Sequence, residues 1–136
     1  MARPYYLALL AEVCTKGGQT EEGLSILAEA LALGHKTGER FCEAELYRLQ
    51  GELLLARSTH QAAEAETCFQ QALAVARHQG AKSLELRAAM SLSRLWQRQG
   101  KGAEAREPLA PIYNWFTEGF DTTDLQEAKA LLEELA

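Results

Sequence analysis

Apolar residues recur three and four positions apart along most of the chain, and no stretch alternates convincingly between apolar and polar residues. One such stripe consists of Leu46, Leu49 and Leu53, and a second consists of Leu84, Met90 or Leu92, Leu95 and Trp96. This spacing places side chains on one face of an α-helix, whereas a half-buried strand needs alternation. The pattern therefore predicts an all-α protein.

Glycines and short polar stretches divide the apolar pattern into segments of helical length. Glycine often ends a helix because it adopts the left-handed backbone conformation without steric cost, and Ser and Thr favour turns. The segments between these breaks predict helices near residues 3–16, 20–36, 39–57, 61–79, 82–99 and 103–116, with a last helix near 121–136.

The helices repeat in pairs, because small and large side chains recur in phase. In the first helix of each pair, a small residue falls at Ala11, Gly51 and Ser93, which are 40 and 42 residues apart. In the second helix, a small residue recurs at Gly23, Ala65 and Ala105, and a larger apolar one at Leu27, Phe69 and Leu109. The repeat predicts one domain over residues 1–136, with α-hairpins near 3–37, 39–79 and 82–117.

Gly51 lies in the middle of a predicted helix, where glycine costs about 1 kcal/mol relative to alanine. Small side chains at a helix crossing allow two helix axes to come within or below the usual separation of about 8 to 10 Å. We therefore expect Gly51 and the small residues in equivalent positions to be packing residues.

The last predicted helix has the profile of a cap on the array. Asp121, Thr122 or Thr123 is suited to accept hydrogen bonds at its N-terminus. Its apolar face consists of Leu125, Ala128, Leu132 and Leu135. The other face carries Asp124, Glu127, Glu133 and Glu134, which predicts a solvated outer side.

Two prolines interrupt the helix predicted near 103–116. Pro108 and Pro111 lack the backbone N–H of an ordinary residue, and their rings clash with the preceding turn, so they are expected to bend or break the helix. One interpretation is that the bend brings Trp115, Phe116 and Phe120 under the closing helix. The other is that these rings form an exposed aromatic patch for another protein or a dimer partner.

Charge and cysteine content narrow the class of protein. The net charge of -5 gives no electrostatic reason to expect binding to nucleic acid or to an anionic membrane. The apolar stretch YYLALLAEVC is too short to span a bilayer, and no signal peptide is recognisable. Cys14, Cys42 and Cys68 are far apart and lack CxxC spacing, so we expect reduced thiols in a cytoplasmic protein.

The polar residues do not form the spacing of a catalytic or metal site. His35, His60 and His78 each lie near a predicted helix end or turn, and no set of further ligands is near them in the sequence. The serines and cysteines have no adjacent general base. We therefore expect a protein that is not an enzyme and needs no cofactor or metal.

The second hairpin resembles a tetratricopeptide repeat, on the stretches YRLQGELLL and AEAETCFQQAL. The residues that match the family's pattern are Tyr47, Gly51, Leu54, Ala65, Phe69 and Ala72. The units are longer than the family's usual length of about 34 residues, Gln50 stands where leucine is typical, and no proline closes the second unit. The resemblance implies a right-handed α-hairpin superhelix of three helix pairs with a C-terminal capping helix.

Lengthened units of this kind are similar to the helical tails of large bacterial signalling proteins that also carry a nucleotide-cyclase or DNA-binding output domain and an ATPase module. The similar stretches are RPYYLALLAEV, GERFCEAELYRLQGELLL, AKSLELRAAMSLSRLW and LLEEL. The chain itself contains no phosphate-binding P-loop motif. The resemblance implies a scaffolding or regulatory tail that binds a protein, a peptide or another domain of the same parent chain.

In the family, the first helices of the pairs line a concave binding groove. The positions carried over are Tyr5, Ala8, Glu12, Lys16, Glu45, Arg48, Glu52, Leu55, Arg87, Met90, Arg94, Gln97 and Arg98. Arg87, Arg94 and Arg98 fall on one helical face, and a row of guanidinium groups suits the carboxylates of an acidic peptide or neighbouring domain. The alternative is a solvated face, partly neutralised by Glu45 and Glu52.

Two other functions fit the same predicted fold. The N-terminal hairpin, apolar through Tyr5, Tyr6, Leu9 and Leu10, would let the chain dock on a second copy as a homo-oligomer. Alternatively, the groove would hold a small ligand as part of a sensor.

Overall fold

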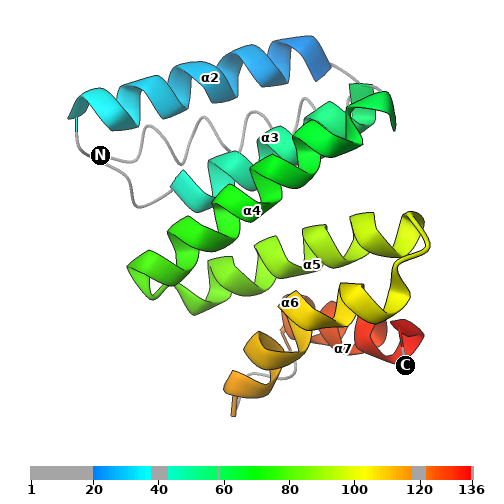
Figure 1. Ribbon diagram of the computed structural model, residues 1–136. Helices are drawn as coiled ribbons and strands as arrows, with labels where there is room; N and C mark the ends of the chain where they lie inside the picture. The colour runs from blue at the N-terminus through cyan, green and yellow to red at the C-terminus, as the bar shows by residue number, and fades with distance from the viewer. Residues whose placement is uncertain (1–19, 38–42, 58, 118–121, 136) are drawn as a thin grey trace.

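The computed structural model describes residues 20–37, 43–57, 59–117 and 122–135. These residues form six α-helices and a short 3-10 helix, and they contain no strand, so the prediction of an all-α protein is confirmed for them (Figure 1). The elements are α2 (Thr20–Thr37), α3 (Glu43–Arg57), η1 (Thr59–Gln61), α4 (Ala62–Gln79), α5 (Lys82–Arg98), α6 (Gly102–Trp115) and α7 (Thr123–Leu135). The helix predicted near 3–16 lies outside the described residues.

Two glycines end helices as the sequence predicts. Gly80, with φ 66°, follows α4, and Gly100, with φ 78°, lies just after the end of α5. At the first, the amide of Ala81 donates to the carbonyl of Ala76 at 2.9 Å, a bond that satisfies a carbonyl of the last helical turn. At the start of α7, Thr122 Oγ1 accepts a hydrogen bond from the amide of Leu125 at 3.5 Å, which selects Thr122 among the predicted caps.

The helix α6 continues through both of its prolines. Pro108 and Pro111 lie inside the range Gly102–Trp115, so the expectation that they break the helix is wrong. The residues next to them explain this, because Leu109 is fully buried and Ile112 is 3% exposed. Burial of these side chains against α5 and α7 offsets the missing hydrogen bonds.

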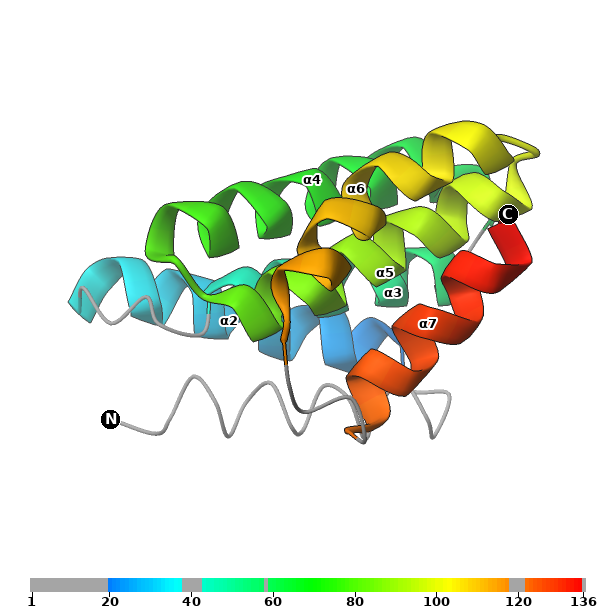
Figure 2. The same ribbon diagram turned by 90° about the horizontal axis from the view of Figure 1, so that it is seen from below.

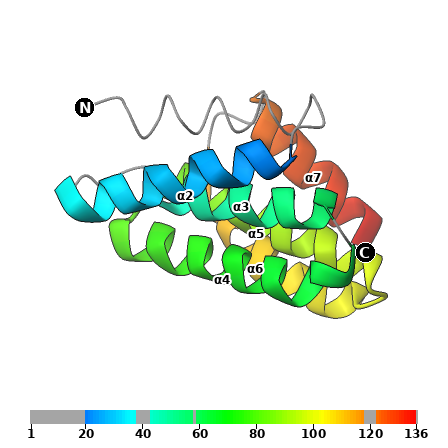
Figure 3. The same ribbon diagram turned by 90° about the horizontal axis from the view of Figure 1, so that it is seen from above.

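Each helix packs against the next one along the chain, from α2 to α7. In addition, α3 contacts α5 and α5 contacts α7, whereas within the described ranges α2 makes no such contact with α4, nor α4 with α6. Figures 2 and 3 show α4 and α6 on one side of α5 and α7 on the other. We call the closely spaced side, formed by α3, α5 and α7, the odd-helix face.

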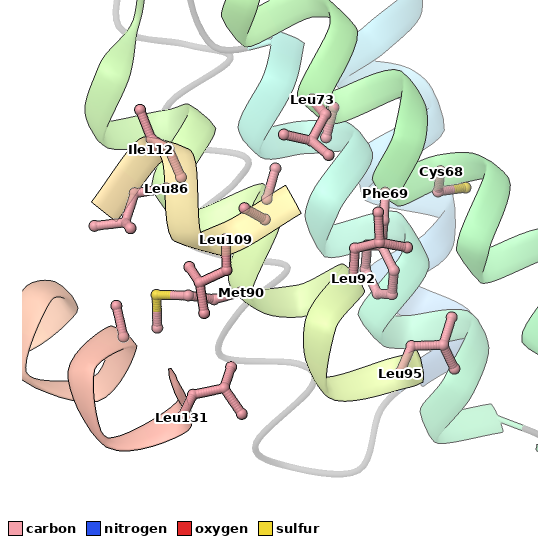
Figure 4. Packing of buried hydrophobic residues seen from close by; sticks show 14 of the residues in the cluster. Cys68, Phe69, Leu73, Leu86, Met90, Leu92, Leu95, Leu109, Ile112 and Leu131 are labelled. Atoms are coloured by element: carbon pink, nitrogen blue, oxygen red, sulfur yellow. The ribbon is translucent and has the colours of Figure 1, made fainter. Parts of the chain in front are cut away.

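The buried side chains of the core confirm that large apolar residues recur at equivalent positions in the second helices of the pairs. Leu27, Phe69 and Leu109, the large apolar residues that recur in the second helices, are all fully buried. Phe69, Leu92, Leu109 and Met90 belong to one cluster of buried side chains (Figure 4). Burial of a Leu or Phe side chain stabilises a fold by about 1.5 to 3 kcal/mol, so these positions carry much of the stability.

The small residues of the first helices are packing residues, as predicted. A Cβ atom added to Gly51 would lie 2.5 Å from Cε1 and 2.8 Å from Cδ1 of Phe69. In the next pair, the hydroxyl of the buried Ser93 donates to the carbonyl of Ala105 at 2.7 Å. Both contacts join the two helices of one hairpin, so the glycine and the serine allow close approach at equivalent crossings. Ala11 lies outside the described residues.

The closing helix α7 is attached through a face slightly different from the predicted one. Leu125, Ala128 and Leu131 are buried, while Leu132 and Leu135 are only partly buried. The inward face therefore includes Leu131, which the sequence pattern did not select.

None of the helices that the structure describes has both the length and the apolar character needed to cross a membrane.

The aromatic residues after the prolines do not all seal the core. Trp115 is 56% exposed, so the interpretation that places it under α7 is wrong, whereas Phe116 is partly buried against the core. Phe120 lies outside the described residues. The rings of Trp115 and Phe116 meet edge to face, with centroids 5.2 Å apart.

Candidate binding surface on the odd-helix face

The predicted groove residues divide into three groups in the structure. Tyr5, Ala8, Glu12 and Lys16 lie outside the described residues. Met90 is 3% exposed and belongs to the core, so its prediction as a groove residue is corrected. The others, Glu45, Arg48, Glu52, Leu55, Arg87, Arg94, Gln97 and Arg98, lie on α3 and α5.

A cluster of charges joins α3 to α5 at one end of the odd-helix face. Arg48 donates from Nη2 to Glu45 Oε2 at 2.7 Å and from Nε to Glu45 Oε1 at 2.9 Å. Arg87 on α5 donates to the same Oε2 at 2.7 Å. The Glu45 side chain is only 12% exposed. Helical spacing also allows Arg48 to pair with Glu52, four residues further on, but the structure forms the pair with Glu45.

The environment of Glu45 keeps it charged. Burial favours the neutral form of this carboxyl group, but the hydrogen bonds and charge of Arg48, together with the charge of Arg87, outweigh burial and hold its pKa below the ordinary value of 4.5. A carboxylate with two guanidinium partners is a strong structural contact and a poor proton acceptor. The cluster therefore serves the packing of α3 against α5.

The acidic side chains of α7 extend this row of charges. Arg87 Nε lies 3.7 Å from Asp124 Oδ2, and Arg94 Nη2 lies 3.5 Å from Glu127 Oε2. Gln97 Nε2 donates to Glu134 Oε2 at 3.4 Å. The expectation of a solvated outer side holds for Glu127, Glu133 and Glu134, which are exposed, whereas Asp124 is only partly exposed. Three of these four acids nevertheless also reach side chains of α5.

Beyond these pairs, α5 and α7 enclose an open cleft of about 340 Å³. The cleft is lined by Arg94, Gln97, Arg98, Glu127, Ala130, Leu131 and Glu134, and we call it the α5–α7 cleft. Arg98 is exposed and has no ion-pair or hydrogen-bond partner within the described residues. Within the described part of the chain, Arg94 is held only by the long contact to Glu127, in which both side chains are substantially exposed.

The row of arginines is therefore not uniform. Arg87 is bound on two sides, Arg94 has one loose partner, and Arg98 has none in the described part of the chain. Exposed ion pairs contribute about 0 to 1 kcal/mol to the stability of a fold. A carboxylate of another molecule can therefore replace Glu127 beside Arg94 at little cost in free energy. The guanidinium groups are therefore less fully paired towards the C-terminal end of α5 within the described residues.

The described residues contain little that suggests a catalytic or metal-binding site. No group of three or more His, Cys, Asp or Glu side chains within the described ranges is placed to hold a metal ion. His60 and His78 are exposed. Burial, with a smaller contribution from Glu64, raises the pKa of the Cys68 thiol above its ordinary value of 9.0, which disfavours the reactive thiolate.

Comparisons of the chain with models of protein families, with curated proteins and with solved structures find no match. The function must therefore be argued from the arrangement of these side chains.

Proposed function

We propose that this protein is a non-enzymatic helical-repeat module that binds an acidic segment of a partner protein, or of another domain of the same parent chain, in the α5–α7 cleft. The observation that carries the proposal is the exposed end of the arginine row. Arg94 and Arg98 project from one face of α5 into a cleft of about 340 Å³, and Arg98 lacks a partner within the described residues. Guanidinium groups bind carboxylates through paired, charge-assisted hydrogen bonds.

The arrangement of the helices supports the same proposal. Contacts along α3, α5 and α7, without equivalent contacts among the described even-numbered helices, support a stack that bends towards the odd-helix face. A bent stack of α-hairpins is the architecture of tetratricopeptide-like superhelices, which bind partners on their concave side. In this proposal the chain is a scaffolding or regulatory unit of a bacterial signalling protein, as the resemblance of its sequence implies.

The charges and apolar residues of the cleft also restrict which segments can bind in it. The cleft carries Glu127 and Glu134 beside the two arginines, so a bound segment must offer carboxylates to Arg94 and Arg98 and a neutral or apolar side chain near Ala130 and Leu131. Such a surface is small, and association of the isolated domain should be modest in affinity and weaken with salt.

The test is the binding of a fluorescein-labelled synthetic peptide in which Asp and Glu are interspersed with Leu, measured by fluorescence anisotropy. The double variant Arg94→Glu/Arg98→Glu should bind at least about tenfold more weakly, because charge reversal removes both guanidinium contacts. The matched control is Arg57→Glu/Lys101→Glu, which changes the net charge equally at residues outside the cleft. Equal weakening in the two double variants, or no binding to the unaltered protein, would contradict the proposal.

A further inference from the structure

The even-numbered helices form a second surface with unusual features. Within the described ranges α4 and α6 do not contact each other, and an open cavity of about 320 Å³ lies between them. Leu73, Leu92, Trp96 and Pro108 contribute apolar lining, and Arg77 and Glu107 add opposite charges. The indole Nε1 of Trp96 donates to Glu66 Oε1 at 2.9 Å, which fixes the ring beside the cavity.

A chain of contacts connects this cavity to the exposed tryptophan. Arg77 Nε lies 3.3 Å from Glu85 Oε2, and Lys82 Nζ lies 3.7 Å from Glu85 Oε1. Lys82 Nζ also lies 5.4 Å from the centre of the Trp115 ring, within the range of a cation–π contact. The cavity, the two cations and Trp115 therefore belong to one region, which we call the α4–α6 surface.

Trp115 is the only large apolar side chain exposed among the described residues. Tryptophan has the largest surface of any side chain, and exposing it to water sacrifices hydrophobic free energy. At protein interfaces, by contrast, tryptophan is among the residues that contribute most to binding. Its neighbour Phe116 already packs on the core and fixes the chain at this point, so Trp115 is held outward on a firm support.

The charges around Trp115 indicate what the partner carries. The side chain of Glu85 is 9% exposed and balances only one of its two cations. Arg77 and Lys82 are 56% and 37% exposed, and with Glu85 they leave an excess of one positive charge among the described residues of this cluster. Glu66 and Glu107 mark the opposite end of the surface with negative charge. A segment that places an acidic residue beside Lys82 and Trp115 complements this end of the surface, and a basic residue at the same place does not.

We infer that the α4–α6 surface is a second docking site, for a segment of a partner protein that places an apolar side chain against Trp115 and an acidic residue beside Lys82. The site is independent of the α5–α7 cleft, because α4 and α6 lie on the opposite side of α5 from α7 (Figure 2). A scaffold with two such surfaces would hold two partners, or two parts of one partner, at a fixed separation.

The test uses the variant Arg94→Glu/Arg98→Glu, so that the α5–α7 cleft does not contribute to the signal. This protein is labelled with 5-fluorotryptophan, and its ¹⁹F spectrum has one resonance for each of the two tryptophans. The probe is a short synthetic peptide in which Asp and Glu are interspersed with Leu and Phe. The control peptide has Lys in place of every acidic residue.

The acidic peptide should shift the Trp115 resonance to saturation, and the basic peptide should not. Trp115→Ala should weaken binding of the acidic peptide, measured by calorimetry, at least about tenfold, as expected for an aromatic anchor. Because Trp115 is exposed, this variant should keep the helical circular dichroism and melting temperature of its parent.

Three outcomes would overturn the inference. The first is a Trp115 resonance that does not respond to the acidic peptide. The second is equal binding of the acidic and basic peptides. The third is a shift of the same resonance when the protein is concentrated alone and sediments as a dimer, which would identify a second copy as the occupant.

Discussion

At the scale of single residues, the close contact between Gly51 and Phe69 defines how a hairpin of this protein is packed. Gly51 lies inside α3, where alanine would form a better helix by about 1 kcal/mol. The space that a methyl group would need is occupied by the ring of Phe69, which is fully buried. The glycine is thus required by the neighbouring helix rather than by its own backbone conformation.

We predict that Gly51→Ala destabilises the protein by up to about 2 kcal/mol, because the overpacking penalty of about 1 to 3 kcal/mol outweighs the gain of about 1 kcal/mol in helix propensity. The measurement is the free energy of unfolding from urea titration. Gly102→Ala is the matched control, since a Cβ atom there meets nothing within 4 Å at the start of α6. A Gly51→Ala variant that is as stable as the unaltered protein would refute the account of this contact.

The packing role of Gly51, Ser93 and Phe69 could be predicted because their positions recur in phase along the sequence. The exposure of Trp115 and the burial of Met90 could not be predicted in the same way. Met90 and Leu92 both fit the apolar stripe of α5, and the rotation of a helix about its axis is set by all of its neighbours. Trp115 follows two prolines, and its direction depends on whether the helix continues through them.

At the scale of secondary-structure elements, α3, α5 and α7 are linked by charges as well as by the core. Arg87 is central, because it contacts Glu45 on α3 and Asp124 on α7. The sequence predicted a polar face for α7 but placed it towards solvent. Helical spacing places Asp124, Glu127 and Glu134 on one flank of α7 and Glu133 on the opposite side. Spacing does not show what this flank meets, and the docking of α7 brings it against the side chains of α5.

We predict that Glu45→Gln lowers the free energy of unfolding at pH 7 by about 2 kcal/mol, the value of a charge-assisted hydrogen-bond pair. The folded protein lowers the pKa of Glu45 below 4.5. The stability that this carboxylate provides is therefore fully present above that pH, and it is lost as the pH falls through the lower pKa of the folded state. The difference between the variant and the unaltered protein should shrink as the pH decreases below 4.5.

The appropriate control for that experiment is Glu52→Gln in the same helix, because Glu52 has no ion-pair partner among the described residues. Its unfolding free energy should stay close to that of the unaltered protein at pH 7. A difference between Glu45→Gln and the unaltered protein that is the same at pH 7 and at acidic pH would show that the charge of Glu45 contributes nothing.

At the scale of the whole molecule, the order of the helices and their pairing could be predicted from the sequence, and the surfaces only in part. Repeating small and apolar residues determine which helices pack together, because only one alignment of neighbouring helices buries all of the apolar side chains. The binding properties of a face depend on which charges are already neutralised inside the protein. Arg87 and Arg98 look equivalent in the sequence, yet Glu45 and Asp124 engage the first and leave the second open to a partner.

The most direct test of the proposed function is to map the acidic Asp/Glu/Leu peptide onto the unaltered, ¹⁵N-labelled protein by NMR. We predict that the largest chemical-shift changes occur at the guanidinium Nε–H signals of Arg94 and Arg98. The backbone amides of Gln97 and Ala130, which line the same cleft, should respond at the same peptide concentrations. Saturation of the protein with peptide while these signals remain unchanged would contradict the account.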